Sequence, residues 1–418
     1  MLYAMKEEIL SNLANPAKLE RLYRADKTTF KRTFRSLYPE LTNSNLAEFW
    51  NERLSFAGED VFWGSNRELL FVIAVSLFAG LIAKLPVLIP VNEDFFYPRN
   101  IGFVVFPALC AYFVWRNNLS KTKIAFIAGI ILFGAVYINL LPDLKTSDTL
   151  ILSCIHLPLV LWATLGFAFV GEKGNNTARR LGFLRYSGDL VVMTALILLA
   201  GALMSVITVG LFELIGVDLK KYYFDYVAIF GLSAAPIVGT HLTQTNPQLV
   251  GKVSPVIAKI FSPLVLIMLV IYLIAIAYSG KNPYSDREFL MVFNALLVGV
   301  MAIIFFSVAE TSETESHRAG VWVLFLLSII TALVNGIALS AILFRISAWG
   351  ITPNRGAVLG GNVFILINLI LVTGQLYKVL SKSAPISGVG KVISQYLPVY
   401  FVWALIVTFL FPLLFWFK

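Results

Sequence analysis

Long apolar runs constrain the fold of this chain more than any other feature of its sequence. From Leu69 to Phe417 the chain repeats stretches of about 17–25 mostly apolar residues, separated by short polar segments that contain Lys, Arg, Gly or Pro. A helix of about 20 residues, rising ~1.5 Å per residue, matches the ~30 Å hydrocarbon core of a bilayer. The sequence therefore predicts an all-α fold, a polytopic helical membrane bundle.

The composition supports a bilayer as the main partner of the chain. Only 14% of its 418 residues are charged and 58% are hydrophobic, so water cannot cover most of its surface. The net charge of +9 comes mostly from the N-terminal segment and the connecting loops, so we predict no nucleic-acid partner. Cys110 and Cys154 lie inside apolar runs without Cys or His neighbours at metal-ligand spacing, and we predict no metal or other cofactor.

The apolar runs predict about ten to eleven transmembrane helices. They cover residues 69–90, 101–115, 123–141, 149–171, 188–215, 226–244, 256–278, 287–309, 319–345, 356–378 and 397–417. Alternate loops carry more basic residues, among them Arg116, Lys121, Arg179 and Lys382, and such loops stay in the cytoplasm. We therefore predict a cytoplasmic N-terminus. Lys84, late in the first span, is predicted to extend its amine to the outer interface.

Residues 1–68 form a separate amphipathic part, and residues 69–418 form the transmembrane domain. Asn15 and Pro16 can begin a helix that Pro39 ends, and a second helix can follow from Asn43 or Ser44. The pattern predicts a small cytoplasmic helical hairpin. It can be a domain docked on its own membrane part, or its basic, aromatic face can bind anionic lipid or a cytosolic partner.

The first interruption of the apolar pattern spans Tyr226 to Pro263, where Pro and Gly recur. Six hydrogen-bonding side chains occupy Thr240 to Asn246, including His241 and Gln244. Transporters build substrate sites from helices that are broken in this way. The alternative is a proline-kinked helix that ends in a polar loop.

The second interruption follows the eighth apolar run. Glu310, Glu313 and His317 share one helical face, and Glu313 with His317 forms an i, i+4 pair. Such a group can contribute ligands to a metal or relay a proton. A solvated acidic helix end is the plainer interpretation.

The third interruption runs from Arg345 to Arg355. Gly350 suits the left-handed position after a helix, Thr352 suits an N-cap and Pro353 suits the first turn of the next helix. This chemistry predicts a helix reversal with Trp349 at headgroup level. It leaves the two arginines unexplained, and they can bind a phosphate or carboxylate or pair with acidic residues of other outer loops.

The same motif resembles a bacterial membrane family known as domain-of-unknown-function family 4153. Members show an Arg, an aromatic-Gly pair and then Leu/Ile-Thr-x-x-Arg before a long apolar helix. Arg345, Trp349-Gly350, Ile351-Thr352 and Arg355 are similar to those positions, whereas Gly356 stands where the family usually has an aromatic residue. The resemblance implies a multi-pass protein of the bacterial inner membrane and carries no reaction.

Three functions remain open from the sequence. Transport or handling of a small solute or lipid is the leading hypothesis, because polar side chains lie inside the spans: Asn139, Asn294, Asn335, Asn362, Asn368 and Gln375. These side chains can instead bond helix to helix, and a cavity between the sixth, ninth and tenth spans would favour transport. The alternatives are a membrane scaffold or regulator acting through residues 1–68, and a transferase that uses Glu93 and Asp94. No catalytic motif favours an enzyme.

Overall fold

The chain forms two compact units, Met1–Phe62 and Trp63–Lys418. The computed structural model describes residues 2–13, 15–25, 30, 33–34, 36–41, 45–55, 63–144, 146–172, 177–214, 218, 220–250, 253–279, 287–310 and 318–417. These residues form helices, turns and loops and contain no strand, which confirms the all-α fold class.

The N-terminal unit has a hydrophobic core of its own. Its described elements are α1 (Leu2–Ser11), α2 (Pro16–Ala25), the 3₁₀ turn η1 (Tyr38–Glu40) and α4 (Asn45–Ser55). Phe30 and Phe34 stack at 5.8 Å, and both rings also contact Trp50. Helix α1, which precedes the predicted hairpin, supplies the buried Ile9 to the same core and was not expected. The predicted caps Asn43 and Ser44 lie outside the described residues.

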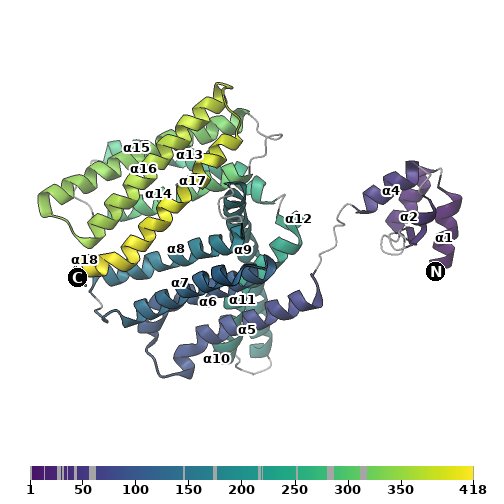
Figure 1. Ribbon diagram of the computed structural model, residues 1–418, viewed down its shortest axis with the longest axis horizontal. Coiled ribbons are helices and arrows are strands. Elements are labelled where there is room, and N and C mark those ends of the chain that lie inside the picture. Colours follow the sequence, from purple (N-terminus) through teal and green to yellow (C-terminus); the bar gives the residue numbers. More distant parts are fainter. Residues whose placement is uncertain are drawn as a thin grey trace. The chain divides into compact units, whose positions relative to one another are not determined.

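The membrane unit is a succession of long helices (Figure 1). Their bounds are α5 (Asn66–Leu88), α6 (Glu93–Arg116), α7 (Lys121–Leu140), α8 (Asp148–Val170), α9 (Thr177–Leu214), α10 (Lys220–Tyr222), η2 (Tyr223–Ala228), α11 (Ile229–Thr245), α12 (Pro247–Val250), α13 (Val253–Ser279), α14 (Arg287–Glu310), α15 (Arg318–Trp349), α16 (Pro353–Leu380), α17 (Ser387–Leu405), η3 (Ile406–Leu410) and α18 (Phe411–Leu414). Within the described ranges, nine helical stretches are long and apolar enough to cross a bilayer, and two shorter ones lie in α13 and α14. Together they correspond to the eleven predicted spans.

Short polar caps explain where several of these helices begin. Ser65 and Glu68 form a reciprocal capping box at the start of α5, and the side chains of Asn92, Ser147 and Thr352 cap α6, α8 and α16. Each cap provides an acceptor for a backbone N–H that the helix itself leaves without a partner. The chain can therefore reverse direction at the membrane surface within a few residues.

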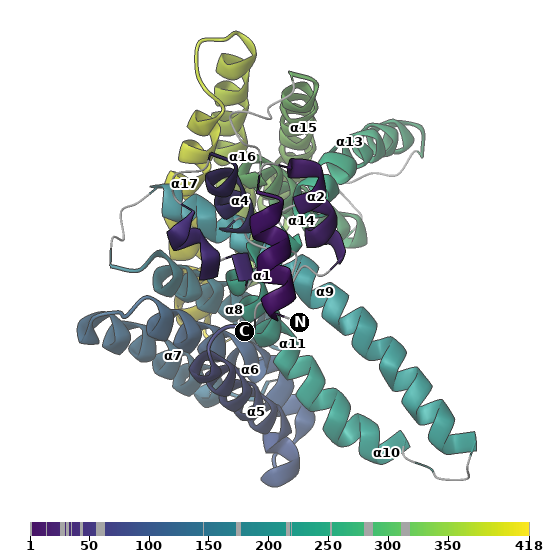
Figure 2. The same cartoon turned by 90° about the vertical axis from the view of Figure 1, so that its right-hand side faces the viewer.

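The helices pack in two groups that α9 joins. One group contains α5, α6, α7, α8 and α11, and the other contains α13 to α17. Helix α9 packs against α11 and α8 on one side and against α14 and α17 on the other. Figure 2 shows α9 and α11 extending from this centre towards α10. The hydrophobic clusters of both groups include the side chain of Trp162, so they are continuous through α8.

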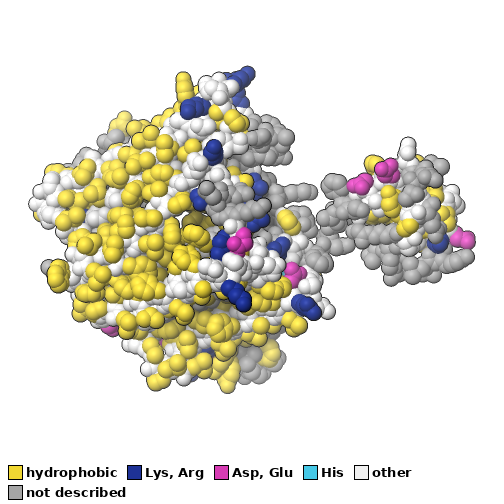
Figure 3. Space-filling model, viewed as in Figure 1, with side chains coloured by type: hydrophobic (Ala, Val, Ile, Leu, Met, Phe, Trp, Pro, Cys, Tyr) yellow, Lys and Arg dark blue, Asp and Glu magenta, His cyan; other side chains and the backbone are white. Residues whose placement is uncertain are grey.

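The two ends of the membrane unit are distinguished by their contacts. One end, here called the Trp63 end, joins residue 63 with the loops after α6, α8 and α11, as in the bond from His241 to the Trp63 carbonyl. The opposite end, the Asp143 end, joins the loop after α7 with the start of α6 and with the C-terminal Phe417. In Figure 3 hydrophobic side chains cover much of the visible face of the helices between these ends.

Two features of the helices differ from an interpretation of the sequence. Helix α11 is continuous through Gly231, Pro236 and Gly239, so the broken-helix interpretation does not hold within it. The side chain of Lys84 does not extend to the interface but is buried, with its amine 4.2 Å from the ring centroid of Tyr226. A cation held against an aromatic face gains an attraction that hydrocarbon does not offer.

Candidate functional site

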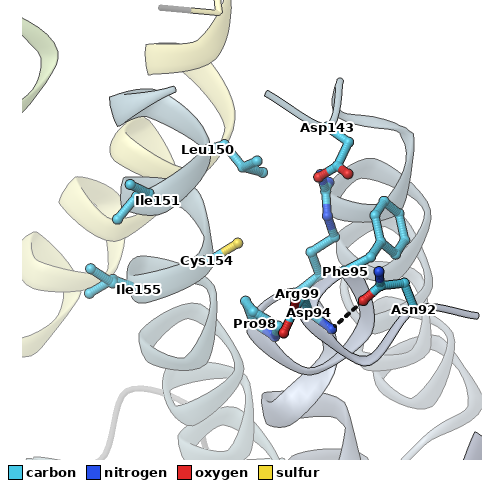
Figure 4. Close-up of a pocket in the computed structure, with 10 residues that line it drawn as sticks. All are labelled: Asn92, Asp94, Phe95, Pro98, Arg99, Asp143, Leu150, Ile151, Cys154 and Ile155. Atoms are coloured by element: carbon cyan, nitrogen blue, oxygen red, sulfur yellow. Dashed lines mark hydrogen bonds and ion pairs between the residues drawn. The ribbon is translucent and has the colours of Figure 1, made fainter. Parts of the chain in front are cut away.

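A half-open pocket of about 520 Å³ lies at the Asp143 end of the membrane unit. The first turns of α6, the loop after α7 and the first turns of α8 line it (Figure 4). One wall is polar and the other apolar. The lining residues are Asn92, Asp94, Phe95, Pro98, Arg99, Asp143, Leu150, Ile151, Cys154 and Ile155.

Arg99 organises the polar wall of this pocket. Arg99 is buried, with 3% of the residue exposed, and its Nη1 donates to the carbonyls of Ile138 at 2.6 Å and Leu141 at 3.1 Å. Nη2 donates to Asp143 Oδ1 at 3.2 Å, and the guanidinium carbon lies 4.3 Å from the ring centroid of Phe95. Arg99 thus provides donors to the last carbonyls of α7, which have no partner within that helix.

The start of α6 supplies the acidic part of the same wall. Asn92 caps the helix by accepting a hydrogen bond from the Asp94 backbone N–H at 2.7 Å. Glu93 and Asp94 therefore occupy the first helical turn, and the expectation that they lie in an outer loop was wrong. Carboxylates in a first turn are stabilised by the positive end of the helix dipole. In Figure 4 Asp94 and Asp143 stand on the same side of the pocket as Arg99.

Helix α8 provides the apolar wall. Leu150, Ile151, Cys154 and Ile155 follow one another at helical spacing, and Ile151 and Ile155 are 48% and 59% exposed. Ser147 caps this helix and also donates to the Phe417 carbonyl at 2.8 Å, which ties the C-terminal segment to the pocket rim. The two isoleucines give the pocket an exposed apolar edge opposite its polar wall.

The predicted reversal between α15 and α16 is present, with a different role for its second arginine. Gly350 has φ +75°, and Thr352 caps α16 by accepting from the Arg355 N–H. The Arg355 side chain donates to the carbonyls of Trp349 at 3.0 Å and Gly350 at 2.7 Å. Turn chemistry therefore does explain Arg355, contrary to the sequence interpretation. Arg345 lies half-buried one turn before the end of α15, and Asp143, an acidic residue in another loop, pairs with Arg99.

His241 and Gln244 lie at the Trp63 end and take part in packing. His241 is buried, shares a hydrogen bond between Nε2 and the Trp63 carbonyl at 3.0 Å, and lies edge-on to Tyr112. At Gln244 the backbone carbonyl accepts from Arg116 at 3.0 Å. The His241 bond attaches the segment that precedes α5 to the end of α11, and the Arg116 bond attaches the end of α6 to it.

Glu310 is the described member of the predicted acidic face. Its side chain is largely buried at the end of α14, 3.4 Å from Arg185 Nε on α9. Arg185 also donates to the Ala309 carbonyl, so it covers the C-terminal end of α14. Glu313 and His317 lie outside the described residues, so their i, i+4 pairing stays a prediction.

The intramembrane amides connect helices in the second group. Asn335 on α15 donates to the Asn362 carbonyl at 3.1 Å, and Asn362 on α16 donates to Asn294 on α14 at 2.8 Å. Asn368 donates to Tyr400 of α17 at 2.9 Å. These bonds are the interhelical alternative considered for the same residues. The pocket beside Arg99 does not involve the sixth, ninth or tenth span, where the transport hypothesis expected a cavity.

The helices and their apolar surface define the class of this chain: it is a multi-pass integral membrane protein. Comparison with protein-family models, curated proteins and solved structures found no match. Among the described residues, no group of three or more His, Cys, Asp or Glu side chains is arranged to hold a metal ion.

Sequence reasoning missed Arg99, the central residue of this pocket. The second span was predicted to begin at residue 101, which placed Arg99 in a loop. Asn92 followed by two acidic residues is an N-terminal helix signal that could have extended the helix to Glu93. Arg99 would then have fallen inside a span, where a charged residue indicates a functional or structural site.

Proposed function

We propose that this protein handles lipid-like amphiphiles, which it binds in the pocket between α6 and α8. The observation that carries the proposal is the division of one pocket into a charged rim and an apolar, lipid-facing wall. A molecule with a polar head and an alkyl chain satisfies both walls at once, whereas a small hydrophilic solute leaves the isoleucine wall uncovered. Lipid handling is one branch of the leading sequence hypothesis.

The charge distribution supports placing this pocket on the outer side of the membrane. The Trp63 end carries five basic residues, Arg116, Lys121, Lys123, Arg179 and Arg180. Loops rich in basic residues are retained in the cytoplasm. With that orientation the pocket opens towards the outer leaflet. The family resemblance of the Arg345–Arg355 motif adds the bacterial inner membrane as the proposed location.

Photocrosslinking in lipid nanodiscs tests the proposal. Purified protein is exposed to a phospholipid with a photoactivatable group in its acyl chain, and the captured peptide is identified by mass spectrometry. We expect the lipid to be captured on α8. We expect Ile151→Trp to reduce this capture severalfold, because the indole occupies the space beside the apolar wall.

The matched control is Leu159→Trp. Leu159 is 50% exposed on the same helix but does not line the pocket, so the same bulk there leaves capture unchanged. Equal capture in the wild type and both variants would mean that the lipid only surrounds α8, and the proposal would be wrong.

The compactness of the N-terminal unit favours a second candidate function, a binding module. Phe30, Phe34 and Trp50 are buried in the core of this unit, whereas Phe49 is exposed. Lys18, Arg21 and Arg24 are exposed on α2, and Arg24 pairs there with Glu20. Such a surface can bind anionic lipid or an acidic partner. The test is removal of residues 1–62 with the membrane unit still inserted: unchanged cellular function in the truncated protein would exclude this candidate.

A further inference from the structure

We propose that the pocket between α6 and α8 selects amphiphiles with a cationic head, of the alkylammonium type. This inference rests on the proposed amphiphile-handling function and adds the sign of the ligand's charge. Three features of the pocket carry it: its net charge, the occupied donors of Arg99 and the capped ends of both helices that border it.

The net charge of the lining is negative. Asp94 and Asp143 contribute two carboxylates, and Arg99 contributes the single cation among the ten lining residues. At a membrane interface, where the local dielectric is below that of bulk water, one uncompensated charge attracts an opposite charge more strongly than it would in solution. The rim therefore favours a cation over an anion.

The guanidinium of Arg99 has few donors left for an anionic head. Its four Nη hydrogens have acceptors in the carbonyls of Ile138, Leu141 and Pro142 and in Asp143 Oδ1, at 2.6 to 3.5 Å. One face of the group lies against Phe95. A phosphate or sulfate would have to displace one of these partners, and α7 would lose a bond at its end.

The carboxylates, in contrast, remain accessible. The side chain of Asp143 is 54% exposed although its partner Arg99 is buried, and Asp94 lies in the exposed first turn of α6. A carboxylate can accept several hydrogen bonds, so Asp143 can hold Arg99 with one oxygen and a ligand ammonium with the other.

The helix N-termini at the pocket do not offset this preference. A free helix N-terminus attracts anions, because its first N–H groups have no partners within the helix. Here Asn92 accepts from the Asp94 N–H at the start of α6, and Ser147 accepts from the Leu150 N–H at the start of α8. The cap carbonyls take further N–H groups, those of Phe95 and Phe96 at Asn92 and that of Ile151 at Ser147, so few backbone donors remain for an anionic head.

The apolar wall defines the rest of the ligand. From Leu150 to Ile155 the wall extends roughly 8 Å along α8 at ~1.5 Å per residue. A chain of several methylene groups covers it, and a longer chain continues into the surrounding lipid past the exposed Ile155. The ligand class is thus an alkyl chain that carries an ammonium group.

Protection of Cys154 from alkylation measures which head enters the pocket. Its thiol lines the cavity, whereas Cys110, the other cysteine, is buried within the helices and reports any general opening. Full-length protein is placed in nanodiscs of a neutral galactolipid without an ammonium group. Dodecyltrimethylammonium, dodecyl phosphate or dodecanol is then added at matched mole fractions before N-ethylmaleimide.

We expect the ammonium compound to protect Cys154 at about a tenfold lower mole fraction than the phosphate, a ratio that corresponds to ~1.4 kcal/mol. In Asp143→Asn the ratio falls towards one, while the amide oxygen can still accept from Arg99. Glu93→Gln is the matched control, because it removes one negative charge beside Asp94 in the first turn of α6, at a residue that does not line the pocket. It leaves the ratio unchanged.

Several outcomes would overturn the inference. If dodecyl phosphate protects Cys154 as well as or better than the ammonium compound, the pocket does not prefer a cationic head. If the ratio falls as much in Glu93→Gln as in Asp143→Asn, the preference comes from the general surface potential and not from the pocket. In both cases the photocrosslinking result decides separately whether the proposed function stands. If no amphiphile protects Cys154, the immobilised fraction of a nitroxide-labelled dodecylammonium serves as the second readout, and an unbound label rejects the inference.

A further comparison identifies the source of the ammonium group. Nanodiscs that contain phosphatidylethanolamine, without added amphiphile, show slower Cys154 alkylation than galactolipid nanodiscs if a membrane phospholipid is the natural occupant. Unchanged alkylation there, together with protection by dodecyltrimethylammonium, assigns the pocket to a single-chain amphiphile.

Discussion

Two arginines perform the same task in different parts of the membrane unit. Arg99 binds carbonyls at the end of α7, and Arg355 binds the carbonyls of Trp349 and Gly350 at the end of α15. A guanidinium presents several N–H groups in one plane, so a single side chain can satisfy two or three carbonyls that the helix leaves free. The two sites differ in environment, because Arg99 is buried and the bonds of Arg355 are exposed.

Replacing Arg99 by Gln should destabilise the membrane unit by about 2–4 kcal/mol, because several charge-assisted hydrogen bonds to buried carbonyls are lost together. The measurement is the thermal transition of the purified protein in detergent. Asp143→Asn is the control and should cost less than ~1 kcal/mol, since the exposed Asp143 side chain contributes a weakly stabilising ion pair. Equal losses in the two variants would contradict this division of roles.

Replacing Arg355 by Gln should reduce stability by about 1 kcal/mol, through the loss of its bonds to the reversal and of its contact with Trp349. The protein should still insert and accumulate. The check combines a thermal transition with the amount of protein in the membrane fraction. An unchanged transition together with lost cellular function would restore the interpretation of Arg355 as a ligand-binding residue.

At the scale of elements, close helix packing depends on aromatic rings placed over glycines. A Cβ added at Gly360 of α16 would lie 2.2 Å from the Trp403 ring of α17, and one at Gly188 of α9 would lie 2.0 Å from the Phe306 ring of α14. Small residues allow helix backbones to approach closely. In lipid the hydrophobic effect does not drive helices together, so the van der Waals contact between closely packed helices stabilises their association instead. The Asn294–Asn362–Asn335 bonds add directional contacts of α16 with α14 and α15.

Gly360→Ala should destabilise the protein by about 1–3 kcal/mol, because the Trp403 ring has to move from its site. Gly374 on the same helix is the matched control, since nothing lies within 4 Å of its added Cβ. Gly374→Ala should be neutral or stabilising by about 0.5–1 kcal/mol through helix propensity. Thermal transitions of the two variants measure both effects, and equal destabilisation would exclude the packing explanation.

At the scale of the whole molecule, the number of crossings determines where the ends of the membrane unit lie. Among the described residues, nine stretches are long and apolar enough to cross a bilayer, and two shorter apolar stretches lie in α13 and α14. The eleven crossings that the sequence predicts would place Trp63 and Phe417 on opposite sides of the bilayer. In the proposed orientation, the basic loops place the Trp63 end in the cytoplasm.

This topology predicts opposite accessibility for two single cysteines in a variant whose native cysteines are replaced. A membrane-impermeant maleimide applied to intact cells should label Ile351→Cys, at the reversal after α15, and should leave Lys382→Cys unlabelled until the membrane is permeabilised. Labelling of Lys382→Cys alone in intact cells would invert the orientation. Labelling of both positions would mean that α16 does not cross the bilayer.

Much of this architecture follows from the sequence because of the solvent. Inside hydrocarbon every backbone N–H and C=O needs an internal partner, so a long apolar run has the helix as its available structure. Each of the eleven predicted spans accordingly corresponds to a helix, and Gly350, Thr352 and Pro353 form the expected reversal. These properties are local: a run length, a cap or a turn is decided within a few residues.

The candidate site depends on contacts that no local pattern contains. Arg99 acquires its role from carbonyls of α7 about forty positions along the chain, and Lys84 is buried because Tyr226 lies beside it. Asn335 and Asn362 likewise hydrogen-bond to neighbouring helices because the packing brings those helices within reach. A polar group in a bilayer takes whatever partner the packing brings within reach. Only the tertiary structure decided which polar groups meet and where an apolar wall stands beside a charged rim.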